Sequence, residues 1–231
     1  MLYGVIGLHK RMTLYQRDVV MGAALRPVLE YGGMDMERHL TLALIDSWDR
    51  KRKAFKIAGR KVPFTVFDMV LMTGLPGIGR KVEVDGEEVS IEVGDMIRRC
   101  MDEWERQEMA RSVPSKSGKK QRFFQHYLNM MIQLCDEHAE EDPLGIWLKL
   151  YAFIVLSGVF SPRTPYGATW SVMCCIDDVV GMDQYAWAKA IWRVVVDAID
   201  DTNKKIRSGL FSEVQLNGFC LLIQVWWVVY A

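Results

Sequence analysis

Residues 216–231 read LNGFCLLIQVWWVVYA, a stretch that is apolar except for Asn217 and Gln224. These two polar side chains are seven residues apart, so they share one narrow stripe of a helix and leave the rest of its surface apolar. A helix that is apolar on most sides is buried, and this stretch is shorter than the roughly 20 residues that cross a bilayer. We therefore predict a core helix at about residues 213–230, with one of its two tryptophans facing inward.

Two other segments have the pattern of core helices. Residues 144–160 are apolar on nearly all sides, and Pro143 is expected at the first helical position. Residues 183–201 have one apolar face and charged side chains repeating every four residues on the other, with Asp183 as the expected N-cap. The core is predicted to form around these two helices and the helix 213–230.

The first third of the chain has shorter elements separated by glycine and proline. A helix over residues 13–31 is expected to bend or divide at Pro27. A second helix is expected to start at Asp35 as its N-cap and to place Trp48 on its apolar face. The other members of that face are Leu40, Ala43 and Leu44.

Two short hairpins are predicted in the same region. Residues 55–57 alternate in polarity, Gly59 marks a turn, and Pro63 restricts the returning strand to a sheet edge. Residues 82–93 alternate on both sides of Asp85-Gly86, a sequence that favours a type I′ turn.

A short helix between the two hairpins is well delimited. Thr65 and Asp68 have the spacing of a capping box, and Gly74 followed by Pro76 is typical of a helix end. The sequence therefore predicts a helix over about residues 65–74.

The fold class that follows is a mainly α-helical domain with one or two small β-hairpins in the N-terminal third. The polar stretch 112–120, which contains Pro114 and Gly118, is the predicted boundary between two modules. Residues 1–112 form a helix and hairpin module, and residues 120–231 form a helical module. We expect the two modules to pack together as one domain.

Composition restricts the class of protein. The chain has 231 residues, half of them hydrophobic, and its 29 basic residues equal its 29 acidic residues. A chain of this length can bury a large core, and a balanced charge creates no overall attraction to nucleic acid or to a membrane. Five cysteines without a paired framework predict buried thiols in a reducing compartment. We expect no signal peptide and no membrane association.

No catalytic, cofactor or metal site is predicted. The carboxylate pairs Asp177-Asp178 and Asp200-Asp201 are adjacent in sequence, so on a helix they point about 100° apart and cannot share a proton. We interpret both as solvated helix ends or as partners of a buried arginine. Cys135 and His138 lie on one helical face, but no other ligand has zinc-site spacing.

Basic clusters are the candidate binding residues. Short lysine and arginine tracts bind phosphates or serve as nuclear import signals, although most are solvated. If they bind nucleic acid, several of them must contact phosphates at once. The first cluster is Arg50, Lys51, Arg52 and Lys53, and the second is Lys116, Lys119, Lys120 and Arg122.

The order of several landmarks resembles the plant mobile domain family, also called aminotransferase-like, which occurs in plant genomes and inside transposable elements. The landmarks span about residues 34–226. In the first half they are Trp48, Phe55-Lys56-Ile57-Ala58-Gly59, Pro63, Thr65, Asp68, Gly74-Leu75-Pro76 and Gly79-Arg80. In the second half they are Phe160, Trp170, Asp177-Asp178, Tyr185-Ala186-Trp187-Ala188 and the run from Leu216 to Trp226.

This resemblance implies a non-catalytic nuclear protein linked to transposon mobility or silencing. No cofactor is expected, because pyridoxal phosphate needs a Schiff-base lysine and a phosphate cradle, and Lys149 has neither in the sequence around it. The predicted function is therefore an interaction or scaffold domain with a protein partner of unknown identity and an open oligomeric state. Two alternatives remain: nucleic-acid binding through residues 50–53 and 116–122, and an accessory domain of a SUMO-type cysteine protease polyprotein, since related domains occur beside such proteases.

Overall fold

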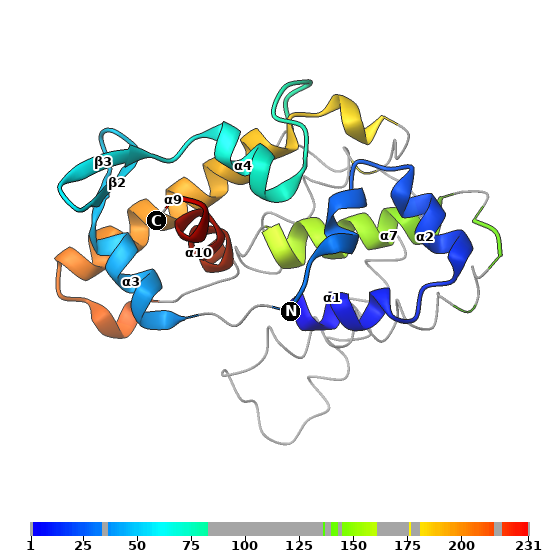
Figure 1. The fold of residues 1–231 in the computed structure, drawn as a ribbon, viewed down its shortest axis with the longest axis horizontal. Coiled ribbons are helices and arrows are strands. Elements are labelled where there is room, and N and C mark those ends of the chain that lie inside the picture. The colour runs from blue at the N-terminus through cyan, green and yellow to red at the C-terminus, as the bar shows by residue number, and fades with distance from the viewer. Residues whose placement is uncertain are drawn as a thin grey trace, which may run out of the picture.

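A computed structural model describes residues 2–33, 37–82, 140–142, 145–160, 181–214 and 219–230, together with Asp136 and Ile176. Within these residues the chain is mainly helical and has one small antiparallel sheet, which confirms the predicted fold class (Figure 1). The predicted hairpin at 82–93, the module boundary at 112–120 and the segment between them lie outside the described residues, Val82 excepted. The α-helices are α1 (Leu2–His9), α2 (Leu14–Met21), α3 (Arg38–Asp46), α4 (Val66–Thr73), α7 (Ile146–Val155), α9 (Trp187–Arg207) and α10 (Phe219–Tyr230).

Shorter helical turns and three strands complete the described elements. The turns are the 3-10 helices η1 (Arg26–Glu30), η3 (Met182–Gln184) and η4 (Phe211–Glu213), and the π-helical turn η2 (Leu156–Phe160). The strands are β1 (Trp48–Asp49), β2 (Ala54–Ile57) and β3 (Arg60–Pro63), in the order β1-β2-β3.

The first predicted hairpin is confirmed as β2–β3. Ala58 and Gly59 connect the strands with φ values of 46° and 77°, and two successive positive φ values are what a two-residue type I′ turn requires. Pro63 ends β3, which lies at the sheet edge, where a residue without an N–H is tolerated. The predicted position of Trp48 in a helix was wrong, because α3 ends at Asp46 and Trp48 begins β1.

The predicted start and end of α4 are confirmed. Thr65 Oγ1 accepts a hydrogen bond from the Asp68 backbone N–H, and Asp68 Oδ2 accepts one from the Thr65 backbone N–H at 2.5 Å. Gly74 ends the helix in the left-handed region at φ 68°. Reciprocal capping and a left-handed glycine satisfy backbone groups that a helix otherwise leaves unpaired at its ends.

Helix α3 differs from its prediction at its start and on its buried face. Glu37 is its N-cap, and the predicted cap Asp35 lies outside the described residues. Its buried residues are Thr41, Leu44 and Ile45, whereas Ala43 is exposed. The apolar pattern therefore identified the helix but misplaced its inner face by a fraction of a turn.

Three other helix boundaries differ from prediction. The segment 13–31 is divided, as expected, but α2 already ends at Met21 and Pro27 lies at the start of η1. Helix α7 begins at Ile146 after Gly145, so the predicted start at Pro143 was wrong. Helix α9 begins at Trp187, and Asp183, its predicted cap, lies in η3.

The last helix contributes to the core, as predicted, but its final turn does not. The Trp226 side chain is fully buried, and its ring centroid lies 4.7 Å from that of Phe55 and 5.9 Å from that of Phe64. Trp227 is half-buried, and the last residues Val228, Val229 and Tyr230 are exposed. The prediction of a buried element therefore holds only for the first part of α10.

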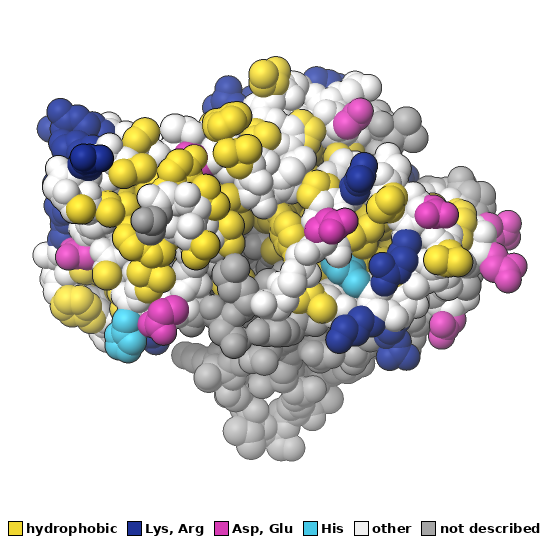
Figure 2. Space-filling model, viewed as in Figure 1, with side chains coloured by type: hydrophobic (Ala, Val, Ile, Leu, Met, Phe, Trp, Pro, Cys, Tyr) yellow, Lys and Arg dark blue, Asp and Glu magenta, His cyan; other side chains and the backbone are white. Residues whose placement is uncertain are grey.

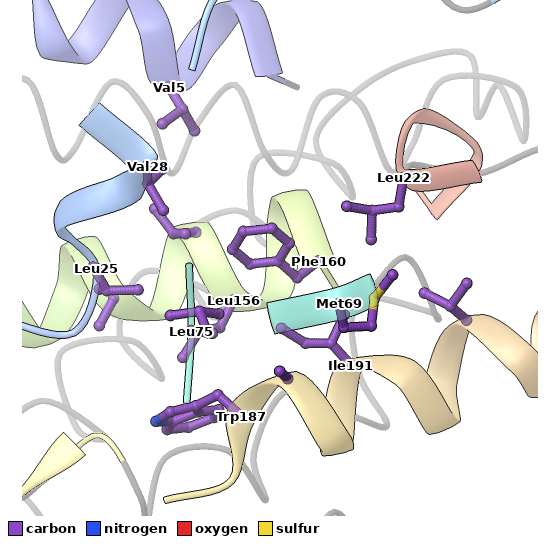
Figure 3. Close-up of a cluster of buried hydrophobic side chains, with 14 of the residues drawn as sticks. Val5, Leu25, Val28, Met69, Leu75, Leu156, Phe160, Trp187, Ile191 and Leu222 are labelled. Atoms are coloured by element: carbon purple, nitrogen blue, oxygen red, sulfur yellow. The ribbon is translucent and has the colours of Figure 1, made fainter. Parts of the chain in front are cut away.

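The core is continuous between the early and the late helices. Figure 3 shows buried side chains from α1, η1, α4, η2, α9 and α10 converging in one cluster. Its members include Met69 and Leu75 from the α4 region, Phe160 from η2 and Ile191 from α9. None of the helices in the described part of the chain is long and apolar enough to span a membrane.

A buried histidine lies between α1 and α7. His9 is 6% exposed, and its Nε2 is 2.8 Å from the hydroxyl oxygen of Tyr151. Burial, with a smaller contribution from the positive charge of Arg17, lowers the pKa of His9 from 6.5 to about 4. The imidazole is therefore neutral in the folded protein at neutral pH.

We expect His9 to make stability depend on pH between about 6.5 and 4. In this window the unfolded chain binds a proton at His9 that the folded chain does not, so the free energy of unfolding falls as the pH falls. One pKa unit corresponds to about 1.4 kcal/mol, so the loss across the window is about 2–3 kcal/mol. Urea denaturation at several pH values should show it. His9→Gln should have a flatter profile, and an unchanged profile would contradict the assignment.

Candidate functional site

The first predicted basic cluster, residues 50–53, forms the connection between β1 and β2 and is anchored to α9. The Lys53 ammonium lies 2.6 Å from Asp200 Oδ2, and Arg50 Nε lies 3.8 Å from Asp200 Oδ1. The same carboxylate accepts a hydrogen bond of 2.7 Å from the Trp48 indole. Of the two interpretations of Asp200, the solvated helix end was wrong, because its side chain is 18% exposed and holds this connection in place. The expected pairing with an arginine occurs, but Arg50 is half exposed and not buried.

A second carboxylate balances two more cations of the hairpin. Asp49 Oδ2 lies 3.1 Å from the Lys61 ammonium and 3.5 Å from Arg52 Nη1. The hydrogen bond from Lys61 is the main reason that the pKa of Asp49 falls to about 2. Asp49 therefore stays ionised at any physiological pH and keeps Lys61 and Arg52 on one side of the sheet.

The remaining cations of the hairpin have no carboxylate partner among the described residues. These are Lys51, Lys56 and Arg60, all of them exposed. Residues 50–61 carry seven basic side chains, and with Asp49 and Asp200 as the two paired carboxylates an excess of five positive charges remains. We call residues 48–63 the basic hairpin. In Figure 2 it is the blue area at the upper left of the molecule.

Three of the seven basic residues of the basic hairpin were missed by sequence reasoning. Lys56, Arg60 and Lys61 belong to it, but a search for consecutive basic residues stops at Lys53. The available signal was the absence of any acidic residue over positions 50–61. The second predicted cluster, Lys116, Lys119, Lys120 and Arg122, lies outside the described residues.

The anchoring role of the Asp200 carboxylate can be tested by substitution. Asp200→Ala removes the acceptor of the buried Trp48 N–H and leaves it unpaired, which should lower the free energy of unfolding by about 2 kcal/mol. Asp200→Asn keeps an acceptor oxygen at this place and should cost less than about 1 kcal/mol. Urea denaturation followed by circular dichroism measures both values. Equal losses in the two variants would show that the hydrogen bond to Trp48 is not the stabilising contact.

No cluster of three or more His, Cys, Asp or Glu side chains that could hold a metal ion occurs in the described ranges. Of the pairs considered for catalysis or for zinc, Asp177-Asp178 and Cys135 with His138 lie outside these ranges, whereas Asp200-Asp201 lies on α9. Cys220, the cysteine within the described ranges, is fully buried on α10.

The landmarks of the two halves of the chain are in direct contact. The Ala188 backbone N–H donates to the Pro76 carbonyl at 2.9 Å, and the Arg80 N–H donates to the Gln184 carbonyl at 2.7 Å. The Arg80 guanidinium lies 4.9 Å from the centre of the Tyr185 ring, a distance at which cation and ring attract each other. The motifs that carry the family resemblance therefore join α4 to the start of α9.

An exposed apolar surface lies over α4 and the end of α10. Phe67 and Leu71, one turn apart in α4, are 65% and 59% exposed. Val228 and Val229 at the end of α10 are also exposed, and the Tyr230 hydroxyl donates to Asp68, which holds the end of α10 against α4. Figure 2 shows hydrophobic side chains gathered on this face. We call Phe67, Leu71, Val228 and Val229 the apolar face.

Comparison with known proteins gives one family and one plant relative. A family model described as "Domain of unknown function (DUF8566)" matches residues 3–224. Protein MAIN-LIKE 1 of Arabidopsis thaliana is 23% identical over 225 residues, which cover 95% of this chain and 41% of that protein. The chain thus spans about two fifths of the length of this relative. No solved structure matches. The similarity loosely supports the resemblance to the plant mobile domain family.

Proposed function

The chain belongs to the DUF8566 family of domains of unknown function, and on that premise we propose that it is a non-catalytic interaction or scaffold domain of the plant transposon-related type. The observation that carries this proposal is the structural role of the landmark residues, which form the core or join elements of the fold. Trp48, Trp226 and Leu75 are buried, and Gly79-Arg80 joins α4 to η3 and α9. The three buried side chains stabilise the fold and are not available to bind a substrate.

A protein is the proposed partner, and the nucleus is the proposed location. Exposed apolar side chains that lie together are typical of protein–protein contacts, and the apolar face is the surface on which we expect the partner. A role in transposon mobility or silencing is also part of the proposal. It follows from the resemblance to the plant mobile domain family, which the similarity to MAIN-LIKE 1 loosely supports.

Affinity purification from plant nuclei, with and without nuclease, tests the proposal. A protein partner should remain bound after nuclease treatment and should be lost in the double variant Phe67→Ser/Leu71→Ser. Leu14→Ser is the matched control, because Leu14 is 82% exposed on α2, away from the apolar face. Processing of a SUMO precursor by the purified chain, or an internal aldimine with pyridoxal phosphate, would contradict a non-catalytic role.

Nucleic-acid binding is a second candidate function, and the charge of the basic hairpin favours it. An excess of five positive charges in one segment of a chain with no net charge concentrates positive potential at one place. A gel shift at low ionic strength tests this function, since binding through phosphate contacts weakens steeply with added salt. The absence of any salt-dependent complex would remove it.

A further inference from the structure

We propose that the tip of the β2–β3 hairpin enters the major groove of duplex DNA. This inference rests on the second candidate function and adds the form of the nucleic acid, the groove and the contacting residues. The tip consists of residues 56–61, where β2 and β3 pair with each other beyond the two residues of β1. In Figure 1 this hairpin lies at the edge of the described fold.

The dimensions of the hairpin fit this groove. Neighbouring strands lie about 4.8 Å apart, and the two residues that each strand contributes to the tip extend about 7 Å before the turn. The major groove of B-DNA is about 12 Å wide and 8.5 Å deep, and it admits a two-stranded β-ribbon. The type I′ turn at Ala58 and Gly59 keeps the end of the ribbon narrow, because both residues are small.

The charges of the tip are placed for contacts with phosphates. Lys56 and Lys61 are directly opposite each other in the register, so both side chains are on one face of the ribbon, and Arg60 is on the other. Like charges directly opposite each other destabilise a sheet. Asp49 balances Lys61, but no described carboxylate balances Lys56 or Arg60. Phosphates on the two walls of a groove would supply the missing negative charges.

The anchoring of residues 50–53 also supports entry of the tip into the groove. Asp200 holds Arg50 and Lys53 against α9, and these contacts fix the base of the hairpin while Lys51 remains exposed. A ribbon held at its base can enter a groove without ordering a flexible segment, which keeps the entropic cost of binding low.

The proposal predicts a preference for duplex DNA over duplex RNA. The major groove of A-form RNA is deep and too narrow for side chains to read, so a ribbon that fits B-DNA does not fit it. Single-stranded DNA has no groove, and it should bind more weakly than the duplex of the same length.

The experiment measures binding of the full chain to fluorescent duplex DNA by anisotropy at several salt concentrations, with duplex RNA and single-stranded DNA of the same sequence as competitors. The test variant is Lys56→Gln/Arg60→Gln. The control is Lys189→Gln/Arg193→Gln, which removes the same charge from the exposed face of α9 near its start. Circular dichroism checks that both variants remain folded.

The wild-type chain and the control should prefer duplex DNA and share one salt slope. Each lost phosphate contact lowers the slope of log K against log salt by about 1, so the test variant should bind more weakly with a slope reduced by about 2. Equal affinity for duplex RNA, or a test variant that binds like the control, would overturn groove docking and leave nucleic-acid binding standing. No salt-dependent binding of the wild-type chain would overturn both.

Discussion

Trp226→Ala is expected to lower the free energy of unfolding by about 3–5 kcal/mol, the usual loss when a buried tryptophan is truncated. The Trp226 ring is fully buried and packs against Phe55 and Phe64, so its removal leaves a cavity between α10 and the sheet. Because small domains are stable by about 5–15 kcal/mol in total, this variant should be partly unfolded near physiological temperature. Urea denaturation followed by far-ultraviolet circular dichroism measures the loss.

Val228→Ala provides the control for Trp226→Ala in the same helix. Val228 is 75% exposed, and substitutions at such positions usually change stability by less than about 0.5 kcal/mol. Trp227→Ala should give an intermediate loss, since this residue is half-buried. If Trp226→Ala cost less than about 1 kcal/mol, the side chain would have to lie at a surface and not in the core.

Gly79→Ala is expected to destabilise the protein by about 4 kcal/mol. Gly79 has φ 143°, a conformation that L side chains rarely adopt, and an added Cβ would lie 2.8 Å from the Gln184 carbonyl carbon. Backbone strain of this kind costs about 1–3 kcal/mol, and overpacking against a backbone that cannot move costs about as much again. A urea denaturation curve should show the lower free energy of unfolding. We also expect the hydrogen bond between Arg80 and Gln184 to be lost in this variant.

Gly22→Ala is the matched control for this glycine. Gly22 has φ −77°, and an added Cβ would meet its nearest neighbours at 3.6 Å, an ordinary van der Waals distance. Alanine at such a position restricts the unfolded chain and should be neutral or stabilising by up to about 1 kcal/mol. Similar losses at Gly22 and Gly79 would mean that the contact between Gly79 and Gln184 is not the cause.

Features that depend on neighbours in the sequence could be predicted from it. The capping box of Thr65 and Asp68, the left-handed Gly74 and the β2–β3 hairpin all result from interactions within a few residues. The burial of the first part of α10 was also predictable, because a helix with so few polar side chains is expected to pack most of its surface into the core. Local patterns therefore identified most of the described elements and their class.

Features that depend on distant contacts could not be predicted. Asp200 and Trp48 are 152 residues apart, so nothing in the local sequence shows that the carboxylate anchors the basic hairpin. The exposure of Val228 and Val229 also depends on distant contacts. The sequence of α10 does not show how far along the helix the residues that pack against it extend. For the candidate site, the sequence identified residues 50–53 but did not reveal which of these cations were already neutralised.

The position of α10 along the chain also has a consequence for biosynthesis. Tyr230 reaches back to Asp68 over 162 residues, and Trp226 completes a cluster whose other rings come from Trp48, Phe55 and Phe64. During translation these rings leave the ribosome long before the helix that covers them, and proteins that depend on such distant contacts fold slowly. The nascent chain therefore exposes an aromatic surface for the time needed to synthesise more than half of these 231 residues. We expect chaperones to bind this surface during that time.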